Sequence, residues 1–302
     1  MAVRFGVVGT GYWAEHVHAP VLRDHPGVEL VGLWGRDPAR REATARAVGT
    51  RPFGSVEELL GAVDALSFCV PPAVQALLAP VAARAGKHLL LEKPLALSPA
   101  VAAAVVEAIE RAGVAALVFF TRRFIPDFEQ SIQALAADGP WVEAQARIHS
   151  GAMLAGTPFA GSVWRQEKGA LWDIGPHALA VLLPILGPVA EARASEDARR
   201  VITLLLRHAS GGTSTTALCL HAEPADAGQS FRFTSARREA TLDAPPIRPE
   251  AAYGAALGEL LNAIAAPGPQ PHRCGVEFAR EVVAILAAAE DGLRSGTWQR
   301  VS

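Results

Sequence analysis

The chain has 302 residues, with 28 Lys and Arg against 30 Asp and Glu and a formal net charge of −2. The length allows about two domains of ~150 residues each, and this near balance of charge does not indicate a nucleic acid or an anionic membrane as partner. No uninterrupted apolar segment reaches membrane-spanning length, and the spacing of Cys69, Cys219 and Cys274 fits neither a disulfide framework nor a cysteine zinc site. The N-terminus enters a strand-like segment without a charged leader, so we expect no signal peptide and a cytoplasmic location.

The first third of the chain alternates short apolar runs with helical patterns. The expected strands are 4–9, 28–35, 64–70, 88–92 and 114–120. The expected helices are 12–24, 38–48, 56–62, 72–86 and 99–112. Continuous apolar strands separated by helices predict an α/β fold with a doubly wound parallel sheet that is covered on both faces.

After about residue 121 the pattern changes to successive strands with few helices. The expected strands are 141–150, 199–208, 212–221 and 230–244, and the expected helices are 170–186, 251–265 and 276–291. This order predicts an α+β domain with a mostly antiparallel sheet that leaves one face open. We therefore predict two domains, residues 1–121 and residues 122–302.

A glycine turn, Gly9-Thr10-Gly11, lies between the first expected strand and the first expected helix. Glycine permits the tight turn and lets the backbone approach a pyrophosphate, which the helix N-terminus then binds. Ala14 replaces the third glycine of the usual pattern, which is an accepted variant. Because the turn opens a βαβ series, it predicts a Rossmann dinucleotide-binding domain; the alternative is an ordinary strand–helix turn.

The tip of the second expected strand indicates which dinucleotide binds. NAD-binding domains place an acidic residue there, on the ribose hydroxyls. This chain has Gly35, which leaves room for a phosphate, followed by Arg36 and, further on, Arg40. We expect Asp37 to cap the helix that starts at Pro38, away from the ribose. The pattern predicts NADP(H) as the preferred cofactor, with NAD(H) also possible; the alternative is that these arginines are ordinary surface residues.

Three segments occur in a characteristic order along the chain. They are "GVVGTGYWA" (6–14), "AGKHLLLEKPLALS" (85–98) and "VWRQEKGALWDIGPHALAVLLPILG" (163–187). Together they resemble the glucose–fructose oxidoreductase/inositol dehydrogenase (Gfo/Idh/MocA) family over essentially the whole chain.

The resemblance implies three catalytic residues, Lys93, Asp173 and His177. Lys93 matches the lysine beside the nicotinamide and the reacting carbon, and the resemblance implies a cis peptide to Pro94. Pro176 is tolerated only in a first helical turn, so we expect a helix from about 172–173 that puts Asp173 and His177 on one face. A helix N-terminus favours a neutral His177 that can take a proton. The alternatives are a surface lysine and a surface Asp–His pair.

The resemblance implies further cofactor contacts. These are Gly9, Thr10, Gly11, Tyr12, Trp13, Gly35, Arg36, Arg40, Val70, Pro71, Pro72, Glu92, Lys93, Trp164, Arg165 and Tyr253. Core packing is the alternative for Trp164 and Tyr253, and we predict no metal site. The chain departs from the family at Ala180, which replaces an acidic residue, and at Glu167-Lys168, which replace glycines. We interpret His149 as a hydrogen-bonded strand histidine rather than a pocket residue.

These features predict an NAD(P)-dependent oxidoreductase that transfers a hydride between nicotinamide and a sugar-like or other small alcohol or carbonyl substrate. Two alternatives stay open: a protein that senses cofactor or ligand without turnover, and a lyase or glycosidase that oxidises its substrate transiently. Apolar residues on both sides of the strands at 199–208 and 212–221 predict that the open sheet face joins subunits of a homodimer or homotetramer.

Overall fold

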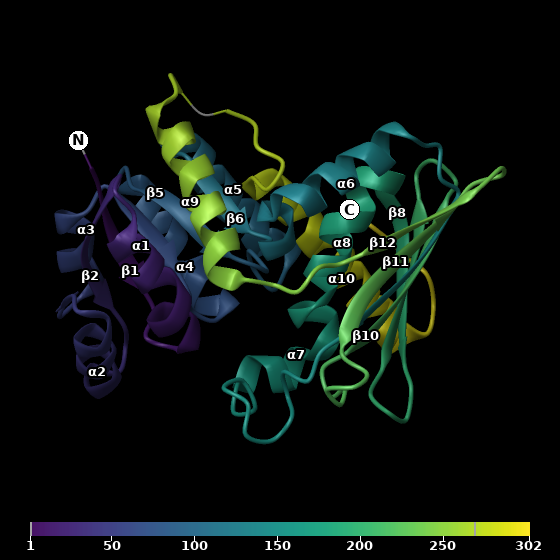
Figure 1. Cartoon of the computed structure of the whole chain (residues 1–302), viewed down its shortest axis with the longest axis horizontal. Coiled ribbons are helices and arrows are strands. Elements are labelled where there is room, and N and C mark those ends of the chain that lie inside the picture. The colour runs from purple at the N-terminus through teal and green to yellow at the C-terminus, as the bar shows by residue number, and fades with distance from the viewer. Residues whose placement is uncertain (1, 269) are drawn as a thin grey trace. The chain divides into compact units, whose positions relative to one another are not determined.

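The computed structural model describes residues 2–268 and 270–302 (Figure 1). It contains two compact units, one made of the residues up to Phe124 with Ile247–Arg280, the other of Ile125–Pro246 with Glu281–Ser302. The predicted fold class, a Rossmann sheet followed by an α+β part, is confirmed. Residues 247–280 group with the N-terminal residues, so the compact units are not two continuous segments; division into domains at residue 121 stays a prediction.

The first unit is built on a six-stranded sheet in the order β3-β2-β1-β4-β5-β6. All neighbouring strands are parallel. The strands are β1 (Val3–Val8), β2 (Val28–Trp34), β3 (Arg51–Pro52), β4 (Ala65–Phe68), β5 (His88–Glu92) and β6 (Ala116–Phe119). The strand order reverses between β1 and β4, and open α/β sheets bind ligands at the carboxyl ends of the strands at such a point.

The helices of the first unit lie largely where the sequence predicts them. They are the π-helical turn η1 (Ala14–His18), α1 (Ala19–Asp24), α2 (Pro38–Val48), α3 (Val56–Ala62), α4 (Pro72–Arg84), α5 (Pro99–Ala112), the 3₁₀ turn η2 (Thr121–Phe124) and α9 (Pro249–Ala265). In η1 the Ala19 N–H bonds to the Ala14 carbonyl. Pro20 has no N–H and its ring crowds the carbonyl four residues back, so a wider turn before it relieves that contact.

The second unit is built on a seven-stranded sheet in the order β12-β11-β7-β10-β9-β8-β13. β7 and β10 are parallel, and the other neighbouring pairs are antiparallel. The strands are β7 (Glu143–His149), β8 (Val189–Glu196), β9 (Ile202–His208), β10 (Thr213–Cys219), β11 (Gly228–Thr234), β12 (Glu239–Asp243) and β13 (Gln299–Arg300). The sequence analysis missed β8 and β13 and merged β11 with β12.

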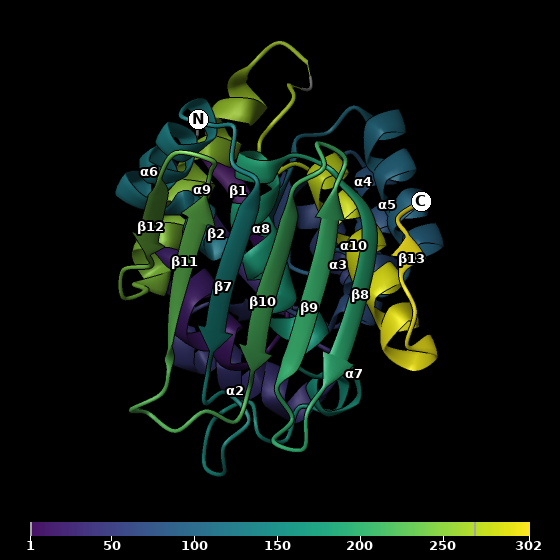
Figure 2. The same ribbon diagram turned by 90° about the vertical axis from the view of Figure 1, so that its right-hand side faces the viewer.

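One face of this sheet packs on helices and the other carries small and polar side chains. The helices are α6 (Pro126–Ala137), α7 (Val163–Asp173), α8 (Gly175–Leu186) and α10 (Val276–Ser295), the last shared with the first unit. Figure 2 shows the strands facing the viewer with α8 and α10 behind them. Leu205 and Ala217 are half-buried and pair across to Thr215 and Thr203 on the open face. The stretch Val163–Leu186 is long and apolar enough to span a membrane, but 83% of its apolar window is buried inside the structure.

Candidate active site

The glycine turn follows β1 and lies beside the end of β4. Gly9 has φ +140°, and a Cβ there would lie 2.5 Å from the Cys69 carbonyl oxygen, so no larger residue fits. Nothing lies within 4 Å of a Cβ built on Gly11, and the Glu15 N–H bonds to the Gly11 carbonyl to start the helix. The turn therefore leaves its backbone open to a ligand at the carboxyl ends of β1 and β4, which fits a dinucleotide pyrophosphate.

The tip of β2 confirms one expectation about Asp37 and overturns one about Gly35. Asp37 is the N-cap of α2, and its carboxylate accepts a 3.1 Å hydrogen bond from the Arg40 N–H. A Cβ on Gly35 would lie 2.5 Å from Cγ2 of Thr10. The space beside Gly35 is therefore filled by Thr10 and is not left open for a phosphate. Gly35 is needed because Thr10 packs against the strand tip.

Arginines surround this strand tip. Arg36 and Arg40 are exposed. Arg41, which the sequence analysis did not select, donates from Nη1 to the carbonyls of Gly35 at 3.4 Å and Gly54 at 3.5 Å. Its Nε is buried and has no hydrogen-bond partner among the described residues. Three arginines thus place positive charge around the carboxyl end of β2.

The segment Glu92-Lys93-Pro94 follows β5, and its Lys93–Pro94 peptide is cis, as predicted. A fully buried side chain, Gln75, holds this segment from α4. Its Oε1 accepts from the Glu92 N–H at 2.8 Å, and its Nε2 donates to the Glu92 carbonyl at 2.7 Å. Since α4 begins at Pro72, directly after Val70 and Pro71, the Val-Pro-Pro turn sets the helix that positions Lys93. A lone glutamine in an otherwise apolar helix is the signal that could have revealed Gln75.

Tyr253 lies in the first unit on a polar chain that the sequence analysis did not foresee. Its hydroxyl donates to Ser67 Oγ at 2.6 Å, and Ser67 Oγ lies 2.8 Å from Nδ1 of His18. The His18 and Tyr253 rings pack with their centroids 4.3 Å apart. Burial raises the pKa of the Tyr253 phenol well above its ordinary value, although the hydrogen bond to Ser67 acts in the opposite direction. Tyr253 therefore remains a phenol and a donor at neutral pH.

The aromatic residues at the start of the first helix lie next to these groups. Tyr12 is 42% exposed and stacks on His16 with centroids 4.4 Å apart. Trp13 meets the His18 ring edge-on at 6.5 Å. Tyr12 is accessible to a ligand at the glycine turn, whereas Trp13 extends towards the buried ring of His18.

In the second unit, three of the predicted site residues lie together. Arg165 Nε forms an ion pair with Asp173 Oδ2 at 3.0 Å, with both side chains largely buried. The Arg165 guanidinium lies 4.7 Å from the ring centroids of both Trp164 and Phe159. Arg165 therefore holds the Asp173 carboxylate in one orientation.

The predicted helix through Asp173 and His177 is wrong in its start. Asp173 ends α7, Ile174 intervenes, and α8 begins at Gly175. Pro176 is confined to the first turn, which fixes the start of α8 just before it. The same-face argument from spacing within one helix does not apply, but His177 does lie in a first turn.

The departures from the family motif contact a pocket within the second unit. Lys168 Nζ donates to both carboxylate oxygens of Glu290, at 2.9 and 3.2 Å, and lies 5.3 Å from the Trp172 ring centroid. The pocket has a volume of about 510 Å³, and its wall includes Met153, Arg165, Lys168, Arg200, His221 and Glu290. Ala180 is buried in α8. Lys168, which stands where the family has a glycine, thus places its ion pair with Glu290 in the wall of this pocket.

His149 is half-buried on β7. Its Nε2 is buried and has no hydrogen-bond partner among the described residues, and burial lowers the pKa of the ring. The interpretation of His149 as a hydrogen-bonded strand histidine is therefore wrong for this nitrogen.

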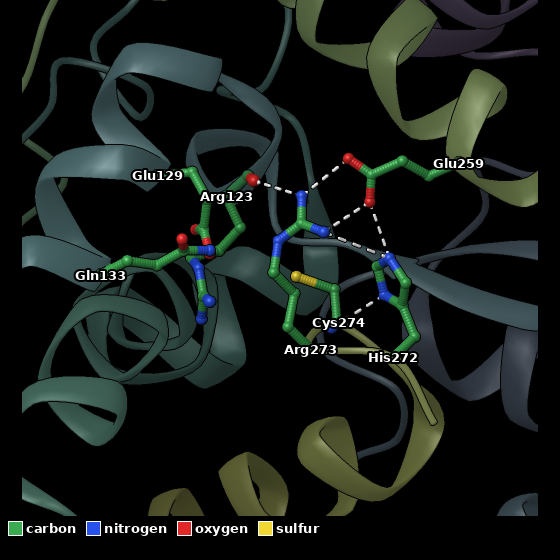
Figure 3. Close-up of polar contacts among 7 residues, drawn as sticks. All are labelled: Arg123, Glu129, Gln133, Glu259, His272, Arg273 and Cys274. Carbon is green, nitrogen blue, oxygen red and sulfur yellow. Dashed lines mark hydrogen bonds and ion pairs between the residues drawn. The ribbon is translucent and has the colours of Figure 1, made fainter. Parts of the chain in front are cut away.

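A cluster of charged residues holds α9 in the first unit (Figure 3). Glu259 accepts from both Nη atoms of Arg273, at 2.6 and 2.7 Å, and lies 2.7 Å from Nε2 of His272. Arg273 also donates to the Arg123 carbonyl at 2.9 Å. Burial alone would raise the pKa of Glu259, but the hydrogen bonds from His272 and Arg273 and their charges lower it to about 2.

We expect Glu259→Gln to destabilise the protein at pH 7, by about 1–2 kcal/mol, because it removes a charge-assisted acceptor from two donors. A depressed pKa contributes stability that is fully present above the ordinary value of 4.5 and is lost as the pH falls towards 2. Urea unfolding at pH 7 and pH 3 should show a difference from wild type that shrinks at pH 3. Glu277→Gln, in an exposed pair with Arg280, is the control with little effect; an equal loss in both variants contradicts the prediction.

A six-stranded parallel sheet with a glycine turn where its strand order reverses defines a Rossmann-type dinucleotide-binding protein. Residues 3–120 match the family described as GFO_IDH_MocA, an oxidoreductase family with an NAD-binding Rossmann fold. This Rossmann segment therefore matches the family that the three sequence segments indicate.

Characterised relatives are similar over part of their length. D-apiose dehydrogenase of Paraburkholderia graminis is 30% identical over 225 residues, which are 69% of this chain and 58% of that protein. Inositol 2-dehydrogenase of Rhizobium meliloti is 34% identical over 130 residues, 42% of this chain and 39% of that protein. The chain thus spans little more than half the length of the first two curated relatives that it matches.

A solved structure shares the fold throughout. The WlbA dehydrogenase of Bordetella pertussis, in complex with NADH and UDP-GlcNAcA, superposes with a TM-score of 0.85 at 20% identity, covering 100% of this chain and 99% of that one. At this identity the likeness shows the fold of both units.

Proposed function

We propose that the protein is an NAD(P)-dependent oxidoreductase that acts on a hydroxyl or carbonyl group of a sugar-like substrate. The observation that carries the proposal is the placement of Lys93. The lysine follows β5, next to the strand pair β1 and β4 where a dinucleotide fits, and Gln75 clamps the segment that holds it. A lysine fixed at the nicotinamide end of such a site can meet the reacting oxygen.

Different residues of the chain bind the cofactor, stabilise charge on the substrate oxygen and transfer the proton. Gly9, Thr10 and Gly11 present backbone N–H groups to the pyrophosphate, and Arg36 and Arg40 face the adenosine ribose. When bound, the nicotinamide accepts or returns the hydride. Lys93 donates a hydrogen bond to the substrate oxygen and stabilises negative charge that develops there. His177 takes the hydroxyl proton during oxidation and returns it during reduction.

Asp173 acts as a positioning residue in this proposal. Its carboxylate is held by Arg165, which itself lies against two aromatic rings, so it offers a fixed acceptor for His177 or for a substrate hydroxyl. Lys93 belongs to the first unit, and Asp173 and His177 to the second.

The names of the relatives and the chemistry of the proposed site support this substrate class. D-apiose dehydrogenase and inositol 2-dehydrogenase carry polyhydroxylated substrates in their names. Lys93 can donate to a hydroxyl or carbonyl oxygen, and Asp173 and His177 can accept from hydroxyl groups. A cytoplasmic location fits an enzyme that draws on the soluble nicotinamide pool and belongs to the same proposal.

A panel of D-glucose, D-xylose, myo-inositol, UDP-N-acetylglucosamine and small ketones tests the proposal. With NADP⁺ or NADPH, a substrate should change the nicotinamide absorbance at about 340 nm, a property of the cofactor. Cofactor binding without any change across the panel would contradict it and favour a sensing protein. Cofactor that copurifies and cycles without net absorbance change while the substrate is converted would favour a lyase or glycosidase.

We predict that the protein is a homodimer or homotetramer joined through the open face of the second unit's sheet. That face carries Leu205 and Ala217 among polar and charged side chains such as Thr215 and Arg207, and a second copy can cover it symmetrically. Light scattering at micromolar concentration should give two or four times the chain mass. Leu205→Lys should shift the mass to that of the monomer, whereas Leu77→Lys, at an exposed position on α4, should not; a monomeric wild type contradicts the prediction.

A further inference from the structure

Four polar side chains form a buried line in the first unit that the proposed reaction does not use. The line runs from Tyr253 on α9 through Ser67 on β4 and His18 on η1 to Glu92, the residue before Lys93. Tyr253, Ser67 and His18 are no more than 1% exposed. Buried polar groups are costly unless each is paired, so this line has a specific arrangement of protons.

The hydrogen bonds at one end of the line allow a tautomer of His18 in which Nδ1 accepts. Tyr253 donates to Ser67 Oγ, and the Ser67 hydroxyl hydrogen can in turn be donated to Nδ1 of His18, 2.8 Å away. With Nδ1 as an acceptor, the neutral imidazole carries its proton on Nε2.

The other end of the line selects this tautomer. Nε2 of His18 lies 3.3 Å from Glu92 Oε1 and has no hydrogen-bond partner among the described residues. The two atoms are within ion-pair distance, but their geometry is not that of a hydrogen bond. An unprotonated Nε2 would point its lone pair at the carboxylate, which is unfavourable. A protonated Nε2 instead points an N–H at an acceptor.

The His18 ring is itself immobilised. It packs against Tyr253 at 4.3 Å and meets Phe119 and Trp13 edge-on, at 6.3 and 6.5 Å between centroids. Gln75 holds the backbone of Glu92 on the other side. The backbone of Glu92 is therefore held, whereas its side chain can still rotate. His18 lies where it can restrain this rotation.

We propose that His18 is a positioning residue whose Nε2–H holds the Glu92 carboxylate and thereby fixes Lys93 for turnover. The kinetic part of this inference rests on the proposed oxidoreductase function. The proton arrangement does not, since it concerns the unliganded protein. Small displacements of a catalytic group can lower the rate strongly. We therefore expect the loss of the His18–Glu92 contact to lower kcat.

Two substitutions separate the two ends of the ring. The amide of His18→Gln reaches the position of Nε2 and can donate to Glu92, whereas the shorter His18→Asn reaches only the position of Nδ1 and Ser67. With the panel sugar that wild type turns over fastest, we expect His18→Asn to lower kcat about tenfold. His18→Gln should stay within about threefold of wild type, with similar melting temperatures for both variants. Equal losses in both, or wild-type kcat in His18→Asn, would overturn the proposal.

A measurement without turnover tests the proton arrangement directly. In protein labelled with ¹⁵N-histidine, the signals lost in His18→Gln identify His18. At pH 7 we expect its Nδ1 in the unprotonated range and its Nε2 in the protonated range. A protonated Nδ1 overturns the inference even if the enzyme is active. An Nε2–H tautomer in a protein that turns over no substrate leaves the arrangement intact and refutes the proposed function alone.

Discussion

Lys93→Ala and His177→Ala should each lower kcat by about 100-fold or more while leaving the affinity for the nicotinamide cofactor nearly unchanged. Positioned proton-transfer groups contribute about 10²–10⁴-fold, and a change confined to kcat marks an interaction made in the transition state. Cofactor affinity should persist because, in the proposed binding mode, the glycine turn and the arginines at the tip of β2 hold the dinucleotide at other points. Steady-state kinetics and fluorescence titration with NADPH measure the two quantities.

Lys87 provides the matched control for Lys93. It is one of three lysines in the chain and donates to the Val63 carbonyl at 2.8 Å, outside the proposed site. Lys87→Ala should retain kcat. Near-wild-type turnover in both Lys93→Ala and His177→Ala would refute the catalytic assignment.

The sequence predicted those features of the fold that follow local rules. Ser98 caps α5 through the Val101 N–H, and Gly113 ends it at φ 64°. Asp37 caps α2 in the same way. In each case a short polar side chain lies next to a proline at the first helical position. It accepts from an N–H of the first helical turn, so both partners lie within four residues. Such features depend on no distant part of the chain.

The missed features depend on residues far apart in the sequence. His18 and Ser67 are 49 positions apart, and Ser67 and Tyr253 are 186 apart, so no local pattern links them. Thr10 fills the space beside Gly35 only because β1 and β2 lie side by side. Likewise, Gly169 has φ 62° inside α7, and this break lies just ahead of the boundary between Asp173 and His177 that a uniform helical period does not reveal.

A preference for NADP(H) has a different physical basis in the structure from the one that the sequence indicates. Gly35 does not leave a space, because Thr10 occupies it. The preference for NADP(H) rests instead on two observations. Asp37 Oδ1 accepts from the Arg40 N–H at the start of α2, so this carboxylate serves as a helix cap. Arg36 and Arg40 are exposed at this strand tip and form no ion pair within the described residues, which leaves their guanidinium groups available to a phosphate.

We propose that NADP(H) binds more tightly than NAD(H) and that Arg36→Ala weakens NADP(H) binding by about ten- to a hundredfold. One charge-assisted contact to a phosphate contributes roughly 1.5–3 kcal/mol, which corresponds to that range, and NAD(H) has no 2′-phosphate to lose. Fluorescence titration with NADPH and NADH measures both affinities. Arg46→Ala, at an exposed arginine in the last turn of α2, removes a charge of the same kind from the far end of the helix and should change neither. Tighter binding of NADH by wild type, or an equal loss for both cofactors in Arg36→Ala, would show that Arg36 does not read the phosphate.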